Sequence, residues 1–157
     1  MLNIYNDSVY DVTIEKVKSF QRKINDNEQV QQNEDTYTIW LENFNRHHPH
    51  WDNISNIRLF TKEAINKTEK LINAVADAGL DFALPLKIPT HKHNVFKKWS
   101  RLDYVFLSEH LLDTLISCEV ISNDLMLNTN HLPIVTNLDF SIAKAPMKRI
   151  VNYRNIN

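Results

Sequence analysis

Side chains that are able to do acid–base or phosphate chemistry gather in four short stretches of the sequence. Along the chain these are Glu42 to Asp52, Pro89 to His91, Ser100 to Tyr104 and Asn128 to Ile134. The first stretch directly follows a segment that is predicted to be a strand, and polar groups at the carboxyl end of a strand form the usual site edge of α/β folds. Asp103 enters an otherwise apolar strand, where a carboxylate is costly to bury unless it is paired.

Each stretch taken alone also has a plain structural interpretation. The run that holds His47, His48 and His50 is typical of a solvated surface loop. Asn130 and His131 precede Leu-Pro-Ile and are compatible with a simple loop that enters a strand. Chemistry is therefore predicted from the four stretches together and not from any one of them.

Helical and extended patterns alternate in the segments that must position these residues. Apolar spacing predicts one helix that begins near Asp11 or Thr13, followed by a loop over Asn25–Asp35, and a second helix over Thr61–Ala78 that stops at Gly79. β-Branched and aromatic residues predict strands at Leu2–Tyr5, Thr36–Leu41, Leu80–Leu84, Ile88–His91, Leu102–Leu107, Leu115–Ile121 and His131–Phe140. Because several strands have no helix between them, we expect an α/β or α+β fold with a mixed sheet or two packed sheets.

The composition excludes several classes of protein. A net charge of −1 over 157 residues gives no overall basic footprint, so DNA binding would have to come from a local patch. The single cysteine, Cys118, excludes an internal disulfide and a thiolate zinc cluster. No signal peptide or apolar run long enough for a membrane span is visible, so we expect an intracellular protein. Gly79 is the single glycine, whereas average composition would give about ten in a chain of this length. We therefore expect asparagine at some positions with positive φ.

In this order and spacing the four stretches resemble the endonuclease/exonuclease/phosphatase superfamily, in the apurinic-endonuclease-like branch carried by non-LTR retrotransposons. Such domains carry a run like GDFNRHHPxWD after a strand, then PTH, then a strand with R-x-D, then S/T-D-H-x-P-I. The corresponding stretches here read ENFNRHHPHWD, PTH, RLD and TNHLPI. The resemblance implies a four-layer α/β sandwich, incomplete at its N-terminus, in which residues 1–140 match the C-terminal two-thirds of the domain. Residues 141–157 would then be a basic linker or tail toward a reverse transcriptase domain.

The resemblance also implies metal-dependent cleavage of DNA with Mg²⁺ or Mn²⁺. His131 would contact the phosphate and stabilise the charge that develops on it. Asn45 would hydrogen-bond the phosphate or the attacking water. The implied catalytic residues are Tyr5, Asn43, Asn45, Asp103, Asn130 and His131, the implied substrate-binding residues are Arg46 and Thr90, and the one matching metal ligand is Asp103.

Two matching positions carry an amide where the family has an acid. Asn43 replaces an aspartate that helps activate the nucleophile, and a neutral amide cannot take up a proton. Asn130 replaces an aspartate that is expected to orient the imidazole of His131, and a comparable change in a serine protease costs about 10⁴ in turnover. Glu42 lies one residue too early and would face the other side of a strand. The family's metal-binding glutamate lies N-terminal to the matching residues. The sequence thus predicts an impaired, degenerate copy, nuclear if functional, and leaves its status as an enzyme open.

Two further hypotheses stay open on sequence alone. An active nuclease with another metal would use the nitrogen ligands of His47, His48, His50, His91 and His93. A non-enzymatic remnant would bind DNA through cationic side chains, with an affinity that is independent of sequence and falls steeply with salt. The candidate cations are Arg46, Lys97, Lys98, Arg101, Lys144, Lys148 and Arg149.

Overall fold

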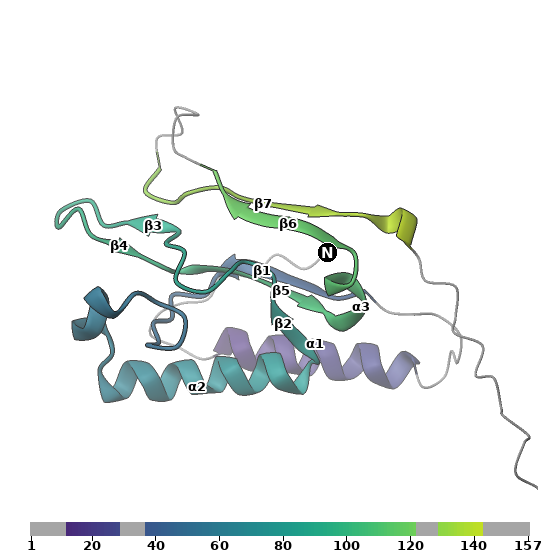
Figure 1. Cartoon of the computed structure of the whole chain (residues 1–157). Coiled ribbons are helices and arrows are strands. Elements are labelled where there is room, and N and C mark those ends of the chain that lie inside the picture. The colour runs from purple at the N-terminus through teal and green to yellow at the C-terminus, as the bar shows by residue number, and fades with distance from the viewer. Residues whose placement is uncertain (1–11, 29–36, 122–128, 143–157) are drawn as a thin grey trace, which may run out of the picture.

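A three-stranded antiparallel sheet in the order β1-β5-β2 forms the middle layer of the computed structural model, which describes residues 12–28, 37–121 and 129–142 (Figure 1). Its strands are β1 (Ile39–Asn43), β2 (Leu80–Phe82) and β5 (Asp103–Ser108). Helices α1 (Val12–Glu28) and α2 (Lys62–Asp77) cover one face, and the hairpin of β6 (Leu115–Val120) and β7 (Ile134–Leu138) covers the other. The protein therefore has an α/β fold with two packed sheets, as the order of the predicted elements indicated.

Shorter elements complete this architecture. The strands β3 (His91–Lys92) and β4 (Trp99–Ser100) form a separate hairpin, seen at the left of Figure 1. A short helix α3 (Glu109–Leu112) links β5 to β6. Two 3₁₀ helices, η1 (Ile54–Leu59) and η3 (Phe140–Ile142), precede α2 and follow β7. No helix within the described ranges is both long enough and apolar enough to cross a membrane.

Strand alternation divides the apolar residues between two cores. Trp40, Tyr104 and Phe106 face the helices and pack in one buried cluster. Val105 and Leu107 face the opposite way and pack with residues of α3, β6 and β7. Asp103 lies two residues before Val105 and four before Leu107 on the same strand. Its side chain is therefore on the same face of the sheet, toward β6 and β7.

Helix α2 forms where the sequence predicted it, and both of its ends have a clear local cause. The Thr61 hydroxyl accepts a hydrogen bond from the Ala64 amide at 3.1 Å and so satisfies one of the free N–H groups of the first turn. The apolar stripe of Leu71, Ala74 and Val75 is buried in the helix-side core. Gly79 has a φ of +64°, a left-handed conformation that glycine adopts at little cost after a helix.

Other boundaries differ from the prediction. Helix α1 continues to Glu28, through the first residues of the predicted loop. Strand β1 begins at Ile39 and ends at Asn43, two residues later than predicted at its C-terminal end. Of the strand predicted over Ile88–His91, only His91 lies in a strand, β3, and β4 was not predicted at all. These two-residue strands are too short to carry a periodic signal. The predicted strand Leu2–Tyr5 lies outside the described residues.

Candidate active site

A carboxylate–imidazole pair joins the start of β5 to the segment that precedes β7. Nδ1 of His131 lies 2.9 Å and 3.1 Å from the two carboxylate oxygens of Asp103. Because an ionised carboxylate only accepts hydrogen bonds, Nδ1 of the ring is the donor, and Nε2 is left for another partner. The side chain of His131 is 38% exposed and that of Asp103 is 18% exposed, so a ligand can reach this imidazole. The two residues were assigned to one site from sequence, and the fold brings them together across 28 positions.

This pair corrects one expectation about Asn130. The sequence interpretation gave the orientation of the His131 ring to residue 130, so an amide there was expected to favour the wrong tautomer. In the structure the ring is oriented by Asp103 instead. The Asn130 carbonyl accepts a hydrogen bond from the Lys92 amide at 2.9 Å, which ties this loop to β3. The tautomer of His131 is therefore set without an acid at position 130.

Asn43 and Asn45 lie on the neighbouring strand. The antiparallel register of β1 and β5 places Asn43 directly opposite Asp103, on the same face of the sheet. Asn43 Oδ1 accepts a hydrogen bond from the Asn45 amide at 2.9 Å, and Asn45 has a φ of +49°. Asparagine tolerates this conformation better than most residues, as expected for a chain so poor in glycine. Glu42 is the register partner of the buried Tyr104 and so belongs to the opposite face from Asn43.

Two residues that the resemblance assigned to substrate binding are buried. Thr90 is 0% exposed, and its hydroxyl oxygen accepts hydrogen bonds from the Leu102 and Asp103 amides at 3.1 Å and 3.0 Å. Arg46 is 2% exposed, and its carbonyl accepts a 2.6 Å hydrogen bond from the Tyr104 hydroxyl. Both side chains are therefore largely enclosed by the fold, and their assignment to substrate binding stays a prediction. Tyr5, the remaining assigned residue, lies outside the described part of the chain.

Solved structures of DNA-processing enzymes share this arrangement of elements. The endonuclease domain of TRAS1, a telomere-specific non-LTR retrotransposon, matches with a TM-score of 0.57 and 20% identity over 85% of this chain and 54% of that chain. The 3′-5′ exonuclease NExo from Neisseria meningitidis matches with a TM-score of 0.59 and 15% identity over 83% of this chain and 53% of that chain. The chain has the endonuclease/exonuclease/phosphatase fold.

An AP endonuclease from Archaeoglobus fulgidus matches in the same way, with a TM-score of 0.54, 14% identity, and coverage of 83% of this chain and 55% of that chain. The chain thus spans about half the length of the solved structures that it matches. No family model and no curated protein matches the sequence. At these identities the comparison establishes the endonuclease/exonuclease/phosphatase fold, and the activity has to be argued from the residues themselves.

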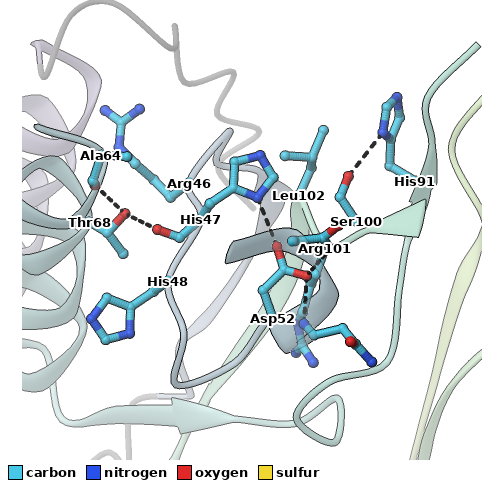
Figure 2. Close-up of polar contacts among 12 residues, drawn as sticks. Arg46, His47, His48, Asp52, Ala64, Thr68, His91, Ser100, Arg101 and Leu102 are labelled. Carbon is cyan, nitrogen blue, oxygen red and sulfur yellow. Dashed lines mark hydrogen bonds and ion pairs between the residues drawn. The ribbon is translucent and has the colours of Figure 1, made fainter. Parts of the chain in front are cut away.

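A second carboxylate–imidazole pair lies in the loop after β1 (Figure 2). Nδ1 of His47 lies 2.8 Å from Asp52 Oδ2. The other carboxylate oxygen accepts hydrogen bonds from the Asn53 amide at 2.8 Å and from Asn56 Nδ2 at 2.9 Å. Asn56 Nδ2 also donates to the Trp99 carbonyl at 2.9 Å, so the network links the loop to β4. Asp52 is the last residue of the motif after β1, but no role was predicted for it. The sequence pattern gives no indication of its hydrogen-bond partners.

Protonation of Asp52 is expected to destabilise the fold. Burial opposes the charged form, but the hydrogen bonds from His47, Asn56 and Asn53 outweigh it and hold the pKa of Asp52 below its ordinary value of 3.8. A lowered pKa in the folded state gives a stabilising contribution that is present above the ordinary pKa and is lost as the pH falls through the folded value. We expect Asp52→Asn to cost about 1.5–3 kcal/mol at pH 7, and we expect this cost to shrink as the pH falls through the folded pKa of Asp52.

Urea unfolding of the wild type and of Asp52→Asn between pH 7 and pH 2.5 checks this expectation. Asp139→Asn is the matched control, because Asp139 also has a lowered pKa but is hydrogen-bonded to Ser141 on the surface. If the difference between wild type and Asp52→Asn were independent of pH, or no larger than that of the control, the buried network would not carry this stability.

His91 is a further residue beside the pair; it lies in the Pro89–His91 stretch, and the only individual role predicted for it was that of a zinc ligand. Its ring lies 4.8 Å from the ring of His131, between centroids, and its Nδ1 lies 3.3 Å from the Ser100 hydroxyl. Burial, followed by the proximity of His131, lowers the pKa of His91. His91 is therefore a neutral neighbour to His131 at physiological pH.

The histidines do not assemble a zinc site in the part of the chain that the structure describes. Within it, no group of three or more His, Cys, Asp or Glu side chains is placed to hold a metal ion. His48 packs on the buried Trp51 with ring centroids 5.2 Å apart, and its Nδ1 accepts a hydrogen bond from the His50 amide at 3.1 Å. These contacts support the structural interpretation of the histidine-rich loop.

Proposed function

We propose that the chain is the nuclease domain of a retrotransposon, built for metal-dependent hydrolysis of DNA phosphodiesters and now impaired. The observation that carries this proposal is the Asp103–His131 pair, with Asn43 opposite Asp103 on the next strand. An oriented and accessible imidazole suits contact with a phosphate, and the opposing strand supplies the position from which an acid would activate water. At that position the chain carries an amide.

The remaining residues take supporting roles in this proposal. His131 contacts the scissile phosphate through Nε2, and Asp103 holds the ring. Asn45, held by Asn43 in its left-handed conformation, hydrogen-bonds the phosphate or the water. Tyr5 and Asn130 belong to the same proposed site. The DNA substrate, a nuclear location and a reverse transcriptase domain in the parent element are parts of the same proposal.

The described side chains do not fit a complete metal centre by themselves. Asp103 is the carboxylate closest to the proposed chemistry, and it is already paired with His131. Its cross-strand neighbour Asn43 supplies an amide oxygen and no charge. Mg²⁺ and Mn²⁺ prefer several oxygen ligands, with carboxylates prominent among them. Dependence on either ion is therefore proposed from the fold and from the chemistry of phosphodiester hydrolysis.

Relaxation of supercoiled plasmid tests the proposal. We expect the purified chain to give no nicking above background with Mg²⁺ or Mn²⁺, because the residue that would take up a proton is an amide. His131→Ala, prepared in the same way, measures any contaminating nuclease. Robust nicking by the wild type that disappears in His131→Ala would show an intact enzyme and overturn the claim of impairment.

A second candidate function, binding of nucleic acid without cleavage, is favoured by the β3–β4 hairpin. Residues 92–99 are all exposed. Lys92 Nζ lies 5.0 Å from the centroid of the Trp99 ring, and the Arg58 guanidinium lies 6.0 Å from that of Phe96. Exposed aromatic rings beside cations are the combination that binds single strands by stacking and charge. Arg46 and Arg101, expected to contribute to such a surface, are 2% and 0% exposed and are withdrawn from it.

Salt dependence of DNA binding tests this second function. We expect Lys97→Gln with Lys98→Gln to reduce the slope of log affinity against log salt concentration by about 2, or about 1 for each phosphate that a lysine no longer neutralises. Lys16→Gln with Lys23→Gln, at exposed positions of helix α1, is the matched control for the removal of two charges. If both double variants changed this slope equally in a gel-shift assay, the hairpin lysines would not be part of the DNA-binding surface.

A further inference from the structure

Thr90 lies at a junction between the two segments that carry the Asp103–His131 pair. Its amide donates to the Ser100 carbonyl at 2.9 Å, and its carbonyl accepts from the Leu132 amide at 2.7 Å. Its hydroxyl oxygen accepts from the amides of Leu102 and Asp103. One residue thus makes hydrogen bonds both to the chain that enters β5 and to the chain that follows His131.

The two hydrogen bonds to the Thr90 hydroxyl act on the backbone of Asp103 itself. The Asp103 amide lies 3.0 Å from Oγ1, which fixes the peptide from which the carboxylate projects. On the other side, the Thr90 carbonyl holds the residue next to His131. The isolated bridge between His91 and His131, and the contact between their rings, add to the same connection. Because Thr90 is 0% exposed, its hydroxyl accepts these hydrogen bonds away from bulk solvent, where an unpaired amide is costly.

We propose that Thr90 is a positioning residue: its buried hydroxyl sets the placement of Asp103 and, through it, the tautomer and orientation of the His131 imidazole. The hydroxyl does this as a hydrogen-bond acceptor from the backbone, without touching a ligand. The use of this arrangement in phosphodiester chemistry rests on the proposed nuclease function. The positioning itself does not, because it concerns a pair of side chains that is already formed without substrate.

The side-chain nitrogen resonances of His131 report this positioning directly in the full chain. In the wild type we expect Nδ1 to carry a proton, because that nitrogen donates to Asp103. In Thr90→Val, which keeps the shape but loses the acceptor, the Nδ1 resonance should shift toward that of a histidine in urea-unfolded protein. In Thr90→Ser, which keeps the hydroxyl, it should remain at the wild-type position. The His131→Gln variant assigns the resonance.

Thr114→Val is the matched control for the removal of a buried threonine hydroxyl. Thr114 is 7% exposed, and its hydroxyl donates to the Leu111 carbonyl at 2.8 Å, with no contact to the pair. The Thr114→Val variant should leave the His131 resonances unchanged. The proposal is overturned if Thr90→Val leaves them unchanged too, if Thr90→Ser does not restore them, or if Thr114→Val shifts them equally.

A second measurement covers the case in which Thr90→Val does not fold. Hydrogen exchange in the wild type should then show the Leu102 and Asp103 amides protected, and Thr90→Ser should keep that protection within about tenfold. Exchange of these two amides at the rate of exposed loop amides would overturn the proposal. Neither measurement uses catalysis, so failure here and failure of the plasmid assay are separate results.

Discussion

Replacing Asn43 by aspartate is expected to raise the affinity of the chain for Mn²⁺ by at least about tenfold, which corresponds to about 1.4 kcal/mol. The register of β1 and β5 places residue 43 directly opposite Asp103, so the variant would present two carboxylates side by side. Hard divalent cations bind such oxygen pairs far better than one carboxylate beside an amide. The wild type lacks this pair of charges, although its backbone already brings the two positions together.

The same variant is expected to be less stable when no metal is present. Two like charges directly opposite on neighbouring strands cost roughly 0.2–1 kcal/mol at neutral pH. One of the two carboxyl groups then has a raised pKa in the folded state, so the deficit should shrink as the pH falls and that group takes up a proton. Added Mn²⁺ should remove the deficit at pH 7, because the cation replaces the proton.

Calorimetric titration with Mn²⁺ and thermal melts with and without the ion measure both effects. Asn137→Asp is the matched control, because Asn137 is exposed on β7 and adds the same charge away from the pair. It should change neither the affinity nor the response to pH. Equal Mn²⁺ affinity in the wild type and Asn43→Asp would show that the two positions do not converge on one cation.

The longer helices and strands were predicted from the sequence because they depend on short-range patterns. Helix α2 has its N-cap at Thr61, its apolar stripe and its glycine stop in one continuous segment. The alternation that separates Asn43 from Glu42 is also local, and the register of β1 with β5 agrees with it. Asp103 was singled out because a carboxylate in an apolar strand needs a partner, and the structure supplies His131 as that partner.

The roles of individual side chains were less predictable because they depend on contacts between distant segments. Thr90 and Arg46 carry the residue types that bind phosphate, yet both are buried. The Thr90 hydroxyl accepts from the Asp103 amide, and the Arg46 guanidinium donates to the Asn45 carbonyl. The partner that orients His131 is 28 positions away, whereas the sequence interpretation chose the adjacent residue. The hydrogen bond from Asn56 to Trp99, which extends the Asp52 network, spans 43 positions and has no periodic signature. Burial and tertiary hydrogen bonds, not residue type, decide between a structural and a chemical role.

Arg101 gives the largest expected loss of stability: we predict that Arg101→Met lowers the free energy of unfolding by about 3 kcal/mol. The side chain is 0% exposed, and its guanidinium donates to the carbonyls of Leu84, at 3.0 Å, and Pro85. It also lies over two aromatic rings, 5.6 Å from the centroid of Phe82 and 5.2 Å from that of Tyr104. One buried cation therefore holds the segment after β2 against β5.

The sign of this prediction depends on which of two opposing effects is larger. Burial disfavours the charged guanidinium and lowers its pKa, so removing the charge recovers a desolvation cost. Against this, methionine leaves the buried Leu84 carbonyl without a donor, at roughly 1–3 kcal/mol, and removes the cation from both rings, at about 0.5–2 kcal/mol each. Methionine is also shorter and does not fill the space of the planar guanidinium group. We expect the hydrogen bonds and ring interactions of the guanidinium to outweigh its desolvation cost.

Urea unfolding at pH 7 measures the balance, with Arg58→Met as the matched control. Arg58 makes the same kind of contact with an aromatic ring, 6.0 Å from the Phe96 centroid, but it is exposed, so its replacement should cost less than about 0.5 kcal/mol. The loss of unfolding free energy in Arg101→Lys should lie between those of Arg101→Met and Arg58→Met. Lysine keeps the charge but lacks the planar guanidinium that donates to two carbonyls at once. A stable Arg101→Met would mean that desolvation dominates. The arginine of the R-x-D motif would then be free for another role, whereas a loss near 3 kcal/mol assigns it to holding the strand from which Asp103 reaches His131.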